Sequence, residues 1–262
     1  MRIAILSDIH GNLPALDAVL AEVAGLGVDV TLNLGDIASG PLWPAETIER
    51  LMPLNLPTIA GNHERQLLTL PRERMGPSDA HAAGCLGDAH RAWLAALPAT
   101  RWLDDEVFCC HGTPGSDLVY LMETVTPDQQ AGGASGLRMA SAAELAERLG
   151  KLRPRLLLCG HTHVPRTMRC GETVIVNPGS VGLQAYDDAH PFVHRVETGS
   201  PHARWALAER DARGQWHVQH RLTPYDWDAA AAQADRHHRG DWADALRTGF
   251  VGRFEASVTA SS

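Results

Sequence analysis

The stretch RIAILSDIHGN, residues 2–12, joins an apolar run to residue types that bind metals. Ile3 to Leu6 has the length and composition of a buried strand, and Asp8 and His10 follow directly. In open α/β sheets, ligands bind outside the carboxyl ends of the strands. The stretch therefore predicts a strand that delivers a carboxylate and an imidazole to a site at one edge of a sheet.

The same arrangement recurs four times along the chain. The later cases are Val28 to Leu34 before Gly35-Asp36, Leu56 to Ala60 before Gly61-Asn62-His63-Glu64, Val107 to Cys110 before His111-Gly112, and Leu156 to Cys159 before Gly160-His161-Thr162-His163. One such motif is common by chance, whereas an ordered set of five is not. We expect five buried strands whose ends meet at a shared metal site.

The remaining pattern alternates helix and strand. Helices are predicted over 13–26, with Asn12 as N-cap, and over 45–52, 82–97 and 141–149, outside a mainly parallel inner sheet. Hairpins are predicted over 166–176 and 203–222. Without repeats or linkers, a single domain over 1–262 is the simplest account. It carries an insert at about 113–150, which contains the Gly132-Gly133 pair. A helical C-terminal tail is predicted at about 225–254, with an interruption near Gly240, and a frayed end over 255–262.

Composition argues against several classes of function. The formal net charge is −8 and Lys151 is the single lysine, so a basic face for nucleic acid is not expected. No apolar stretch approaches the roughly 18 residues of a membrane span. Five cysteines, several within predicted strands, make a poor disulfide framework, and the start lacks the pattern of a signal peptide. These features predict a cytoplasmic protein.

The candidate ligands supply carboxylate, imidazole and amide oxygen, without sulfur. They are Asp8, His10, Asp36, Asn62, His111, His161 and His163. This donor set suits manganese, iron, zinc or nickel. Seven ligands exceed what one open catalytic ion takes, so we expect two divalent ions that share a carboxylate. Glycine beside Asp36, Asn62 and His161 permits the sharp turns that such a site requires.

Together these five motifs resemble the calcineurin-like metallophosphoesterases, and Asn177-Pro178-Gly179-Ser180-Val181 matches a further stretch common in the small bacterial and archaeal branch. The resemblance implies a four-layer αββα sandwich with two mixed central β-sheets flanked by helices. It also implies a two-metal site that hydrolyses phosphate esters through a metal-bridging hydroxide. Carried over by position, one ion would take Asp8, His10 and His163, and the other Asn62, His111 and His161, with Asp36 bridging. His63 would be the catalytic histidine that is not a ligand.

The motifs define the metal chemistry and leave the substrate open. The chain resembles the longer bacterial members of the family in its length, in the segment after His111 and in the Tyr225-Asp226 region. These members are usually described as phosphodiesterases, and some relatives act on dinucleoside polyphosphates. We therefore expect a phosphodiesterase for small molecules, nucleotides included. The alternatives are a phosphomonoesterase or Ser/Thr protein phosphatase, and a metal-binding scaffold, which the filled ligand positions disfavour. The insert and the tail are candidates for substrate selection or for contacts in a homo-oligomer, and a surface excursion without a role remains open for the insert.

Overall fold

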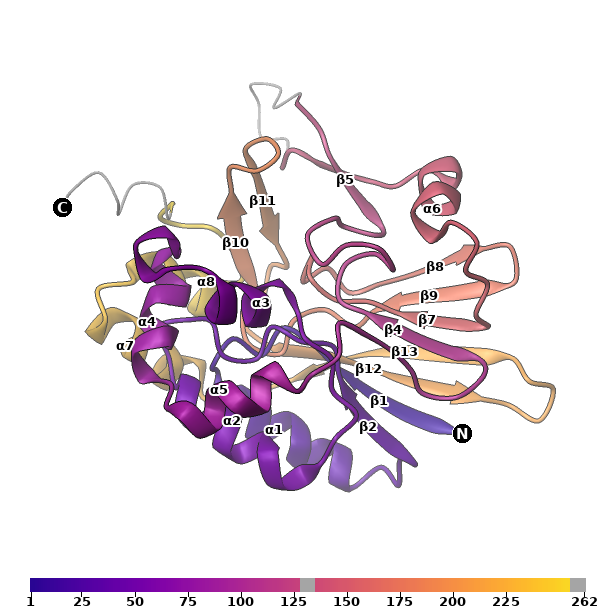
Figure 1. Cartoon of the computed structure of the whole chain (residues 1–262), viewed down its shortest axis with the longest axis horizontal. Helices are drawn as coiled ribbons and strands as arrows, with labels where there is room; N and C mark the ends of the chain where they lie inside the picture. The colour runs from indigo at the N-terminus through magenta and orange to yellow at the C-terminus, as the bar shows by residue number, and fades with distance from the viewer. Residues whose placement is uncertain (128–134, 255–262) are drawn as a thin grey trace.

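Two mixed β-sheets form the centre of the computed structural model, which describes residues 1–127 and 135–254 (Figure 1). The first sheet has the order β13-β12-β1-β2, and its strands are Trp216–Thr223, Ala203–Arg210, Arg2–Leu6 and Val30–Asn33. The second has the order β3-β4-β7-β9-β8, with strands Thr100–Trp102, Val107–Cys110, Leu156–Leu158, Thr173–Asn177 and Arg166–Cys170. In the second sheet the parallel pairs β4–β7 and β7–β9 lie inside and antiparallel strands form both edges. In the first sheet β1 and β2 are parallel at one edge, and β12 and β13 are antiparallel toward the other.

The two sheets stack because the strands are apolar on both faces. In β1, Ile3 and Ile5 point into the core between the sheets, where they join residues of β4, β7 and β9. The alternate residues Ala4 and Leu6 join a second core beneath the helices. This alternation follows from the two-residue period of a strand. A strand buried on both faces therefore reads in the sequence as one continuous apolar run.

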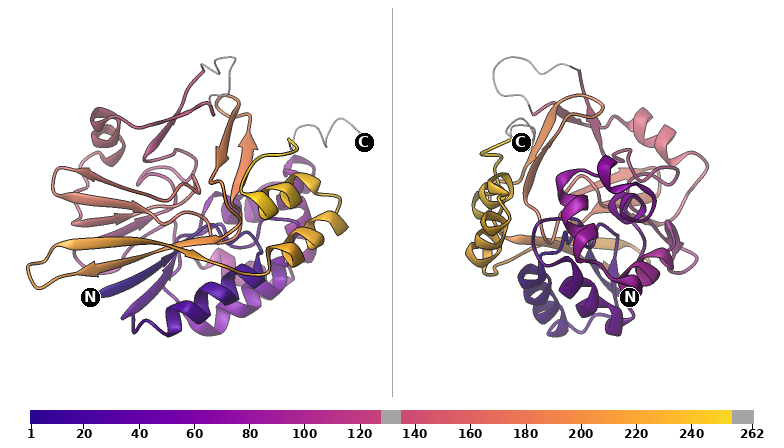
Figure 2. Two further views of the ribbon diagram at one scale, coloured as in Figure 1. Left: turned by 180° about the vertical axis from the view of Figure 1, so that it is seen from behind. Right: turned by 60° about the vertical axis from the view of Figure 1, so that its left-hand side comes forward.

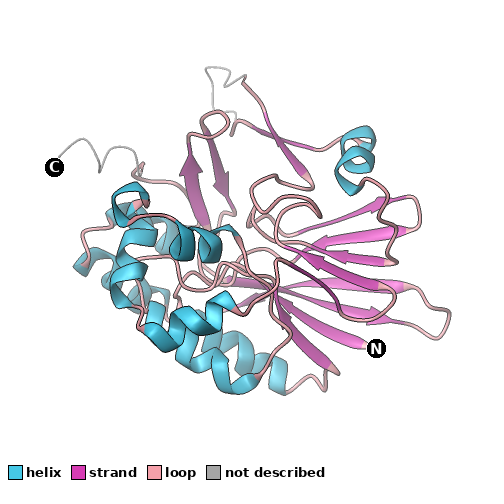
Figure 3. Ribbon diagram, in the orientation of Figure 1, coloured by secondary structure: helices cyan, strands magenta, loops and turns pink. Residues whose placement is uncertain are grey.

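Helices cover the outer face of each sheet (Figure 3). The first sheet packs on α1, α2, α3, α4 and α5, which span Leu13–Ala24, Pro44–Leu51, Asn62–Thr69, Pro77–Cys85 and Asp88–Ala95. The second sheet packs on α6, Ala142–Leu149. Short 3₁₀ turns, Met52–Leu54 and Arg72–Arg74, follow α2 and α3. The predicted four-layer αββα sandwich is confirmed.

Two of the predicted elements are wrong. Leu56 to Ala60 is not a strand, because Pro57 has no N–H to donate and the segment forms only one isolated bridge, Thr58 with Asn33. The predicted helix over 82–97 is instead α4 and α5, separated at Gly87, whose N–H donates to the His90 side chain at the start of α5. The five motifs also follow segments of two facing sheets rather than one edge of a mainly parallel sheet.

Two hairpins stand above the sheets in Figure 1. They are β5–β6, Glu123–Val125 with Leu137–Met139, and β10–β11, Ala185–Asp188 with His194–Glu197. The hairpin β10–β11 was not predicted from the sequence. The Gly132-Gly133 pair of the insert and the predicted frayed end over 255–262 lie outside the described residues.

The C-terminal tail forms α7, Trp227–Arg236, and α8, Gly240–Thr248, which pack on each other. The predicted interruption near Gly240 is confirmed. Figure 2 shows this pair, in yellow, beside the N-terminal helices. All five cysteines are free thiols. Within the ranges that the structure describes, we find no helix that is both long and apolar enough to cross a membrane.

Candidate metal centre

The predicted ligands occupy unusual backbone conformations. Five of the seven non-glycine residues with positive φ in the described chain are candidate ligands: Asp8, His10, Asp36, His161 and His163. Their φ angles lie between 52° and 70°, in the left-handed region that non-glycine residues rarely adopt. Such conformations cost about 1–3 kcal/mol each and are concentrated at functional sites. Backbone strain is therefore concentrated at the residues predicted to bind the metal ions.

The structure brings all seven predicted ligands together. Two groups of three have ligand atoms within 4.8 Å of one another: Asp8, His10 and His163, and Asp36, His111 and His161. Asn62 joins the second group, since its Oδ1 lies 3.1 Å from His111 Nε2. The two groups adjoin, because His111 Nε2 is 3.0 Å from Asp36 Oδ2 and 3.9 Å from Asp8 Oδ1. This division is the one that the family resemblance implies.

Backbone carbonyls orient the four imidazoles. The Nδ1 atoms of His10, His111 and His163 lie 2.8, 2.8 and 2.9 Å from the carbonyl oxygens of Ser39, Leu34 and Leu183. His161 uses its other nitrogen, with Nε2 3.2 Å from the Leu118 oxygen. Metal-binding histidines almost always donate their second ring N–H to such an acceptor. In each ring the remaining nitrogen is left for a metal.

The fit to a cation is clearest at His10 and His163. Their Nε2 atoms lie 3.1 Å apart, and both rings have a carbonyl acceptor at Nδ1. With Nδ1 protonated in both rings, the two Nε2 lone pairs face each other, an arrangement that a shared cation would stabilise. Asp8 Oδ1 lies 3.5 Å from His163 Nε2 and supplies negative charge. The residues fit a divalent metal.

The pKa values of three of the candidate ligands in the metal-free protein agree with this fit, and that of His111 does not. Burial, together with neighbouring histidines, lowers the pKa of His10 to about 4 and that of His161 to about 3. Burial also opposes charge on His111, but Asp36 raises the pKa of that imidazole to about 9. Burial would raise the pKa of Asp36, yet His111 and His63 hold it well below its usual value. A metal requires an ionised carboxylate and neutral imidazoles, so Asp36, His10 and His161 are already in their ligand forms near neutral pH, whereas His111 must lose its proton when a metal binds.

Glu64 joins two of the ligand-bearing turns, a role that the sequence analysis did not assign. Its buried carboxylate accepts hydrogen bonds from the backbone N–H groups of Asp36, Ile37 and Gly61, all at 2.8 Å. The turns approach closely at this point, since a Cβ on Gly61 would lie 2.2 Å from Asp36 Oδ1. The fourth residue of the Gly-Asn-His-Glu motif thus fixes Asp36 and Asn62 relative to each other.

His63, the predicted catalytic residue, lies beside the centre and outside both ligand groups. Its backbone N–H donates to Asp36 Oδ1 at 3.0 Å, and its ring centroid is 5.4 Å from that of His10. Its Nδ1 is 2.8 Å from Asp79 Oδ1, a partner on α4 that the sequence analysis missed. Burial opposes the charge, but Asp36 and Asp79 raise the pKa of His63 to about 10.

Other residues considered from the sequence brace the site. Asn177 donates to Gly160 O and Thr162 Oγ1, while its Oδ1 accepts from Gly179 N–H, so it both forms a turn and supports the His161-Thr162-His163 segment. Asn12 caps α1, as expected, through Ala15 N–H. Arg65 and Arg166, each close in sequence to a motif, are engaged in ion pairs with Asp117 and Glu123.

The centre opens into a cleft of about 1000 Å³. His10, Asp36, Asn62, His161 and His163 line its floor together with His63 and Asp79. The walls come from the loop and hairpin at 118–125, from the hairpin β10–β11, from α4 and from α8. This volume lies at the upper end of the range for pockets that bind drug-sized molecules. The insert and the C-terminal tail therefore both contribute to the walls.

Comparison with known proteins supports the assignment. Residues 1–199 match the calcineurin-like phosphoesterase superfamily domain. A crystal structure of a metallophosphoesterase from Sphaerobacter thermophilus aligns with a TM-score of 0.71 and 25% identity, covering 95% of this chain and 99% of that one. A hypothetical protein from Pyrococcus horikoshii aligns with a TM-score of 0.71 and 19% identity, covering 95% and 98%.

One curated relative is similar over a short segment. An uncharacterized protein from Methanocaldococcus jannaschii is 41% identical over 66 residues, which are 25% of this chain and 27% of that protein. The family match, by contrast, covers most of the chain and includes every motif that converges on the centre. The chain therefore belongs to the calcineurin-like phosphoesterase superfamily, a family of phosphoric ester hydrolases.

Proposed function

We propose that this protein is a dinuclear-metal-dependent phosphodiesterase that hydrolyses small phosphodiesters or nucleotides. The observation that carries the proposal is the pair of adjoining ligand groups on the floor of the cleft, with His63 beside them. Asp8, His10 and His163 would hold one divalent ion, and Asn62, His111 and His161 the other, with Asp36 between them. The donor set suits manganese, iron, zinc or nickel.

The bound ions would activate a water for attack on phosphorus and neutralise charge on the phosphoryl oxygens. The protein's own contribution is geometric. Glu64 and the carbonyls that accept from the imidazoles hold the ligands in place before substrate arrives. His63 lines the cleft with 27% of its side chain exposed, where it can protonate a leaving oxygen. Asp79 holds that imidazole in one orientation.

Two features of the cleft favour a diester with an organic group on each side of phosphorus. Its volume of about 1000 Å³ exceeds the need of a simple phosphate monoester. Leu118 and Val119, 54% and 46% exposed, offer an apolar wall on which a nucleobase can pack. Asp187 and Asp188 of β10, which also line the cleft, add negative charge that disfavours a long nucleic acid backbone. The free thiols suit a reducing compartment, and we propose that the enzyme acts in the cytoplasm.

The test compares two chromogenic esters. Protein stripped of metal and reloaded with manganese should hydrolyse bis-p-nitrophenyl phosphate with a higher kcat/KM than p-nitrophenyl phosphate. Dinucleoside polyphosphates and cyclic nucleotides would then be compared as substrates. A higher kcat/KM on the monoester would contradict the proposal and indicate a phosphomonoesterase, with phosphopeptides as the next substrates. No hydrolysis of either ester by protein that carries two metals would indicate a scaffold.

A further inference from the structure

We propose that Trp242, on the C-terminal helix α8, is a positioning residue of the metal centre. The inference rests on the proposed metal-dependent function and extends it to a part of the chain outside residues 1–199, which match the family domain. Trp242 lines the cleft, although only 5% of it is exposed. Its position is set by packing with α7 and with Leu42, Leu183 and Ala185, in one hydrophobic cluster.

The indole contacts one of the ligand imidazoles. The ring centroids of Trp242 and His10 are 5.9 Å apart, with their planes at 76°. Edge-to-face pairs at such distances are favourable and restrict how each ring can turn. Ser39 O accepts from Nδ1 of His10, and the rings of His63 and His163 also contact it, so the tryptophan adds a further constraint from the side of α8.

The indole also packs on the turn that supplies that carbonyl. A Cβ on Gly40 would lie 2.7 Å from the ring of Trp242 and 2.6 Å from the carbonyl oxygen of His10. Glycine is thus required at position 40 because the indole, the turn and the His10 backbone approach one another so closely. Trp242 therefore packs against both the His10 ring and the turn at Ser39 and Gly40, whose Ser39 carbonyl orients that ring.

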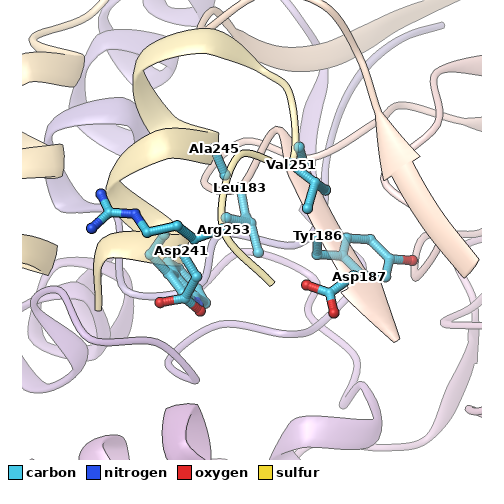
Figure 4. Close-up of a pocket in the computed structure, with 9 residues that line it drawn as sticks. Leu183, Tyr186, Asp187, Asp241, Ala245, Val251 and Arg253 are labelled. Carbon is cyan, nitrogen blue, oxygen red and sulfur yellow. The ribbon is translucent and has the colours of Figure 1, made fainter. Parts of the chain in front are cut away.

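The same cluster reaches the second imidazole of this ligand group. Leu183, whose carbonyl accepts from His163 Nδ1, packs in the cluster of Trp242. A cavity of about 20 Å³ between α8 and the start of β10 is lined by both residues, and Figure 4 shows Leu183 and Tyr186 at this seam with Ala245 of α8. Tyr186 contacts the ring of His163, with centroids 4.8 Å apart. The side of α8 that bears Trp242 thus supports both histidines of one metal group.

Polar contacts anchor α8 in this position. Arg239 and Asp241, both buried, form an ion pair at 2.6 Å, and the guanidinium lies 5.7 Å from the centroid of Trp242. Arg239 also donates to Ser78 Oγ at 3.0 Å, next to Asp79 on α4. Breaking such supporting contacts around a metal typically lowers metal affinity or activity by about 10–100-fold.

The test measures manganese binding by the full-length protein after metal removal, with free Mn²⁺ followed by electron paramagnetic resonance. Trp242→Leu keeps most of the apolar volume but removes the aromatic contact with His10. Trp227→Leu is the matched control, because Trp227 lies on α7, packs on His202 and does not line the cleft. Trp242→Phe is the conservative variant, and thermal unfolding verifies that all three are folded.

Wild-type protein should bind two ions per chain. We expect Trp242→Leu to weaken one of the two by about 10–100-fold, Trp242→Phe to restore most of that affinity, and Trp227→Leu to bind like wild type. Wild-type affinity at both sites in Trp242→Leu, or an equal loss in Trp227→Leu, would overturn the inference while leaving the proposed function intact. Wild-type protein that binds no metal would overturn the proposed function and this inference together.

Discussion

His63 and Asp79 are joined by a 2.8 Å contact between Nδ1 and Oδ1 in the lining of the cleft, so an aspartate on α4 fixes a histidine on α3. With Nδ1 bound in this way, Nε2 is the ring nitrogen left for a leaving group. The carboxylate also stabilises the charged imidazole, because Asp79 is one of the groups that raise the pKa of His63.

Replacing that carboxylate should affect the rate and leave metal binding intact. We expect Asp79→Asn to lower kcat by about 10²-fold, because the amide neither stabilises the imidazolium nor fixes its tautomer as well. Asp105→Asn, at an exposed position outside the cleft, is the control. Steady-state kinetics with metal analysis measures the effect. An unchanged kcat would show that Asp79 does not support catalysis through His63.

Removing the imidazole itself should have an effect that depends on the leaving group. His63→Ala is expected to retain both metals and to lose about 10²–10⁴-fold in kcat if His63 is the general acid. The loss should shrink with p-nitrophenol, a good leaving group that needs no proton, and grow with an alkyl alcohol. A series of phosphodiesters with graded leaving-group pKa measures this dependence. Equal losses across the series would contradict the role of proton donor.

How far the sequence predicts the site depends on whether the signal is local. Asp8, His10 and the other candidate ligands follow apolar runs, and that local pattern was enough to select seven residues that the structure places close together. Asp79 carries no such signal, since it meets His63 only through the packing of α4 on α3. Glu64 lay within a recognised motif. Its position two residues after Asn62 at a helix start could have indicated that its carboxylate accepts hydrogen bonds from backbone N–H groups, a set of contacts that we call the Glu64 clamp.

The fold was predictable to the same extent. Val107 to Cys110 forms a strand with the predicted bounds. A strand buried on both faces is a continuous apolar run in the sequence, so its ends can be read directly. The sequence did not reveal that the ligand-bearing segments belong to two sheets, since strand order depends on packing between distant elements. The neighbouring glycines indicated sharp turns, and Gly11 and Gly35 do have positive φ, but the sequence did not reveal that the candidate ligands themselves, such as Asp8 and His161, adopt left-handed angles.

Asp36, the carboxylate that we propose bridges the two ions, should control both metals. We expect Asp36→Asn to weaken both ions, because an amide oxygen is a poorer bridging ligand than a carboxylate and no longer balances the charge of two cations. Metal content after dialysis and turnover with added manganese are the two readouts. Two tightly bound ions together with near-normal turnover would refute the bridging assignment.

The clamp formed by Glu64 should matter for stability as well as for metal binding. Glu64→Gln replaces an acceptor of three backbone N–H groups with a side chain that has one acceptor oxygen and an amide donor. The free energy of unfolding should fall by about 3 kcal/mol, because a buried N–H is left without a partner. Denaturant unfolding measures the change, with Glu147→Gln on the exposed face of α6 as control. Equal stability of the two variants would contradict the clamp.

Metal removal should lower the thermal stability of the whole chain. In the metal-free protein two buried carboxylates and four imidazoles crowd one centre, and five of these six residues hold left-handed backbone angles. A ligand that binds only the folded state at 100 times its Kd adds about 2.7 kcal/mol, which for a chain of this size corresponds to about 5–10 °C in Tm. Differential scanning calorimetry before and after chelation should show that decrease, and excess manganese should reverse it. Asp36→Asn should respond to neither treatment, because it has lost the shared ligand. A wild-type Tm that is unchanged by chelation would mean that the centre does not hold metal in the folded protein.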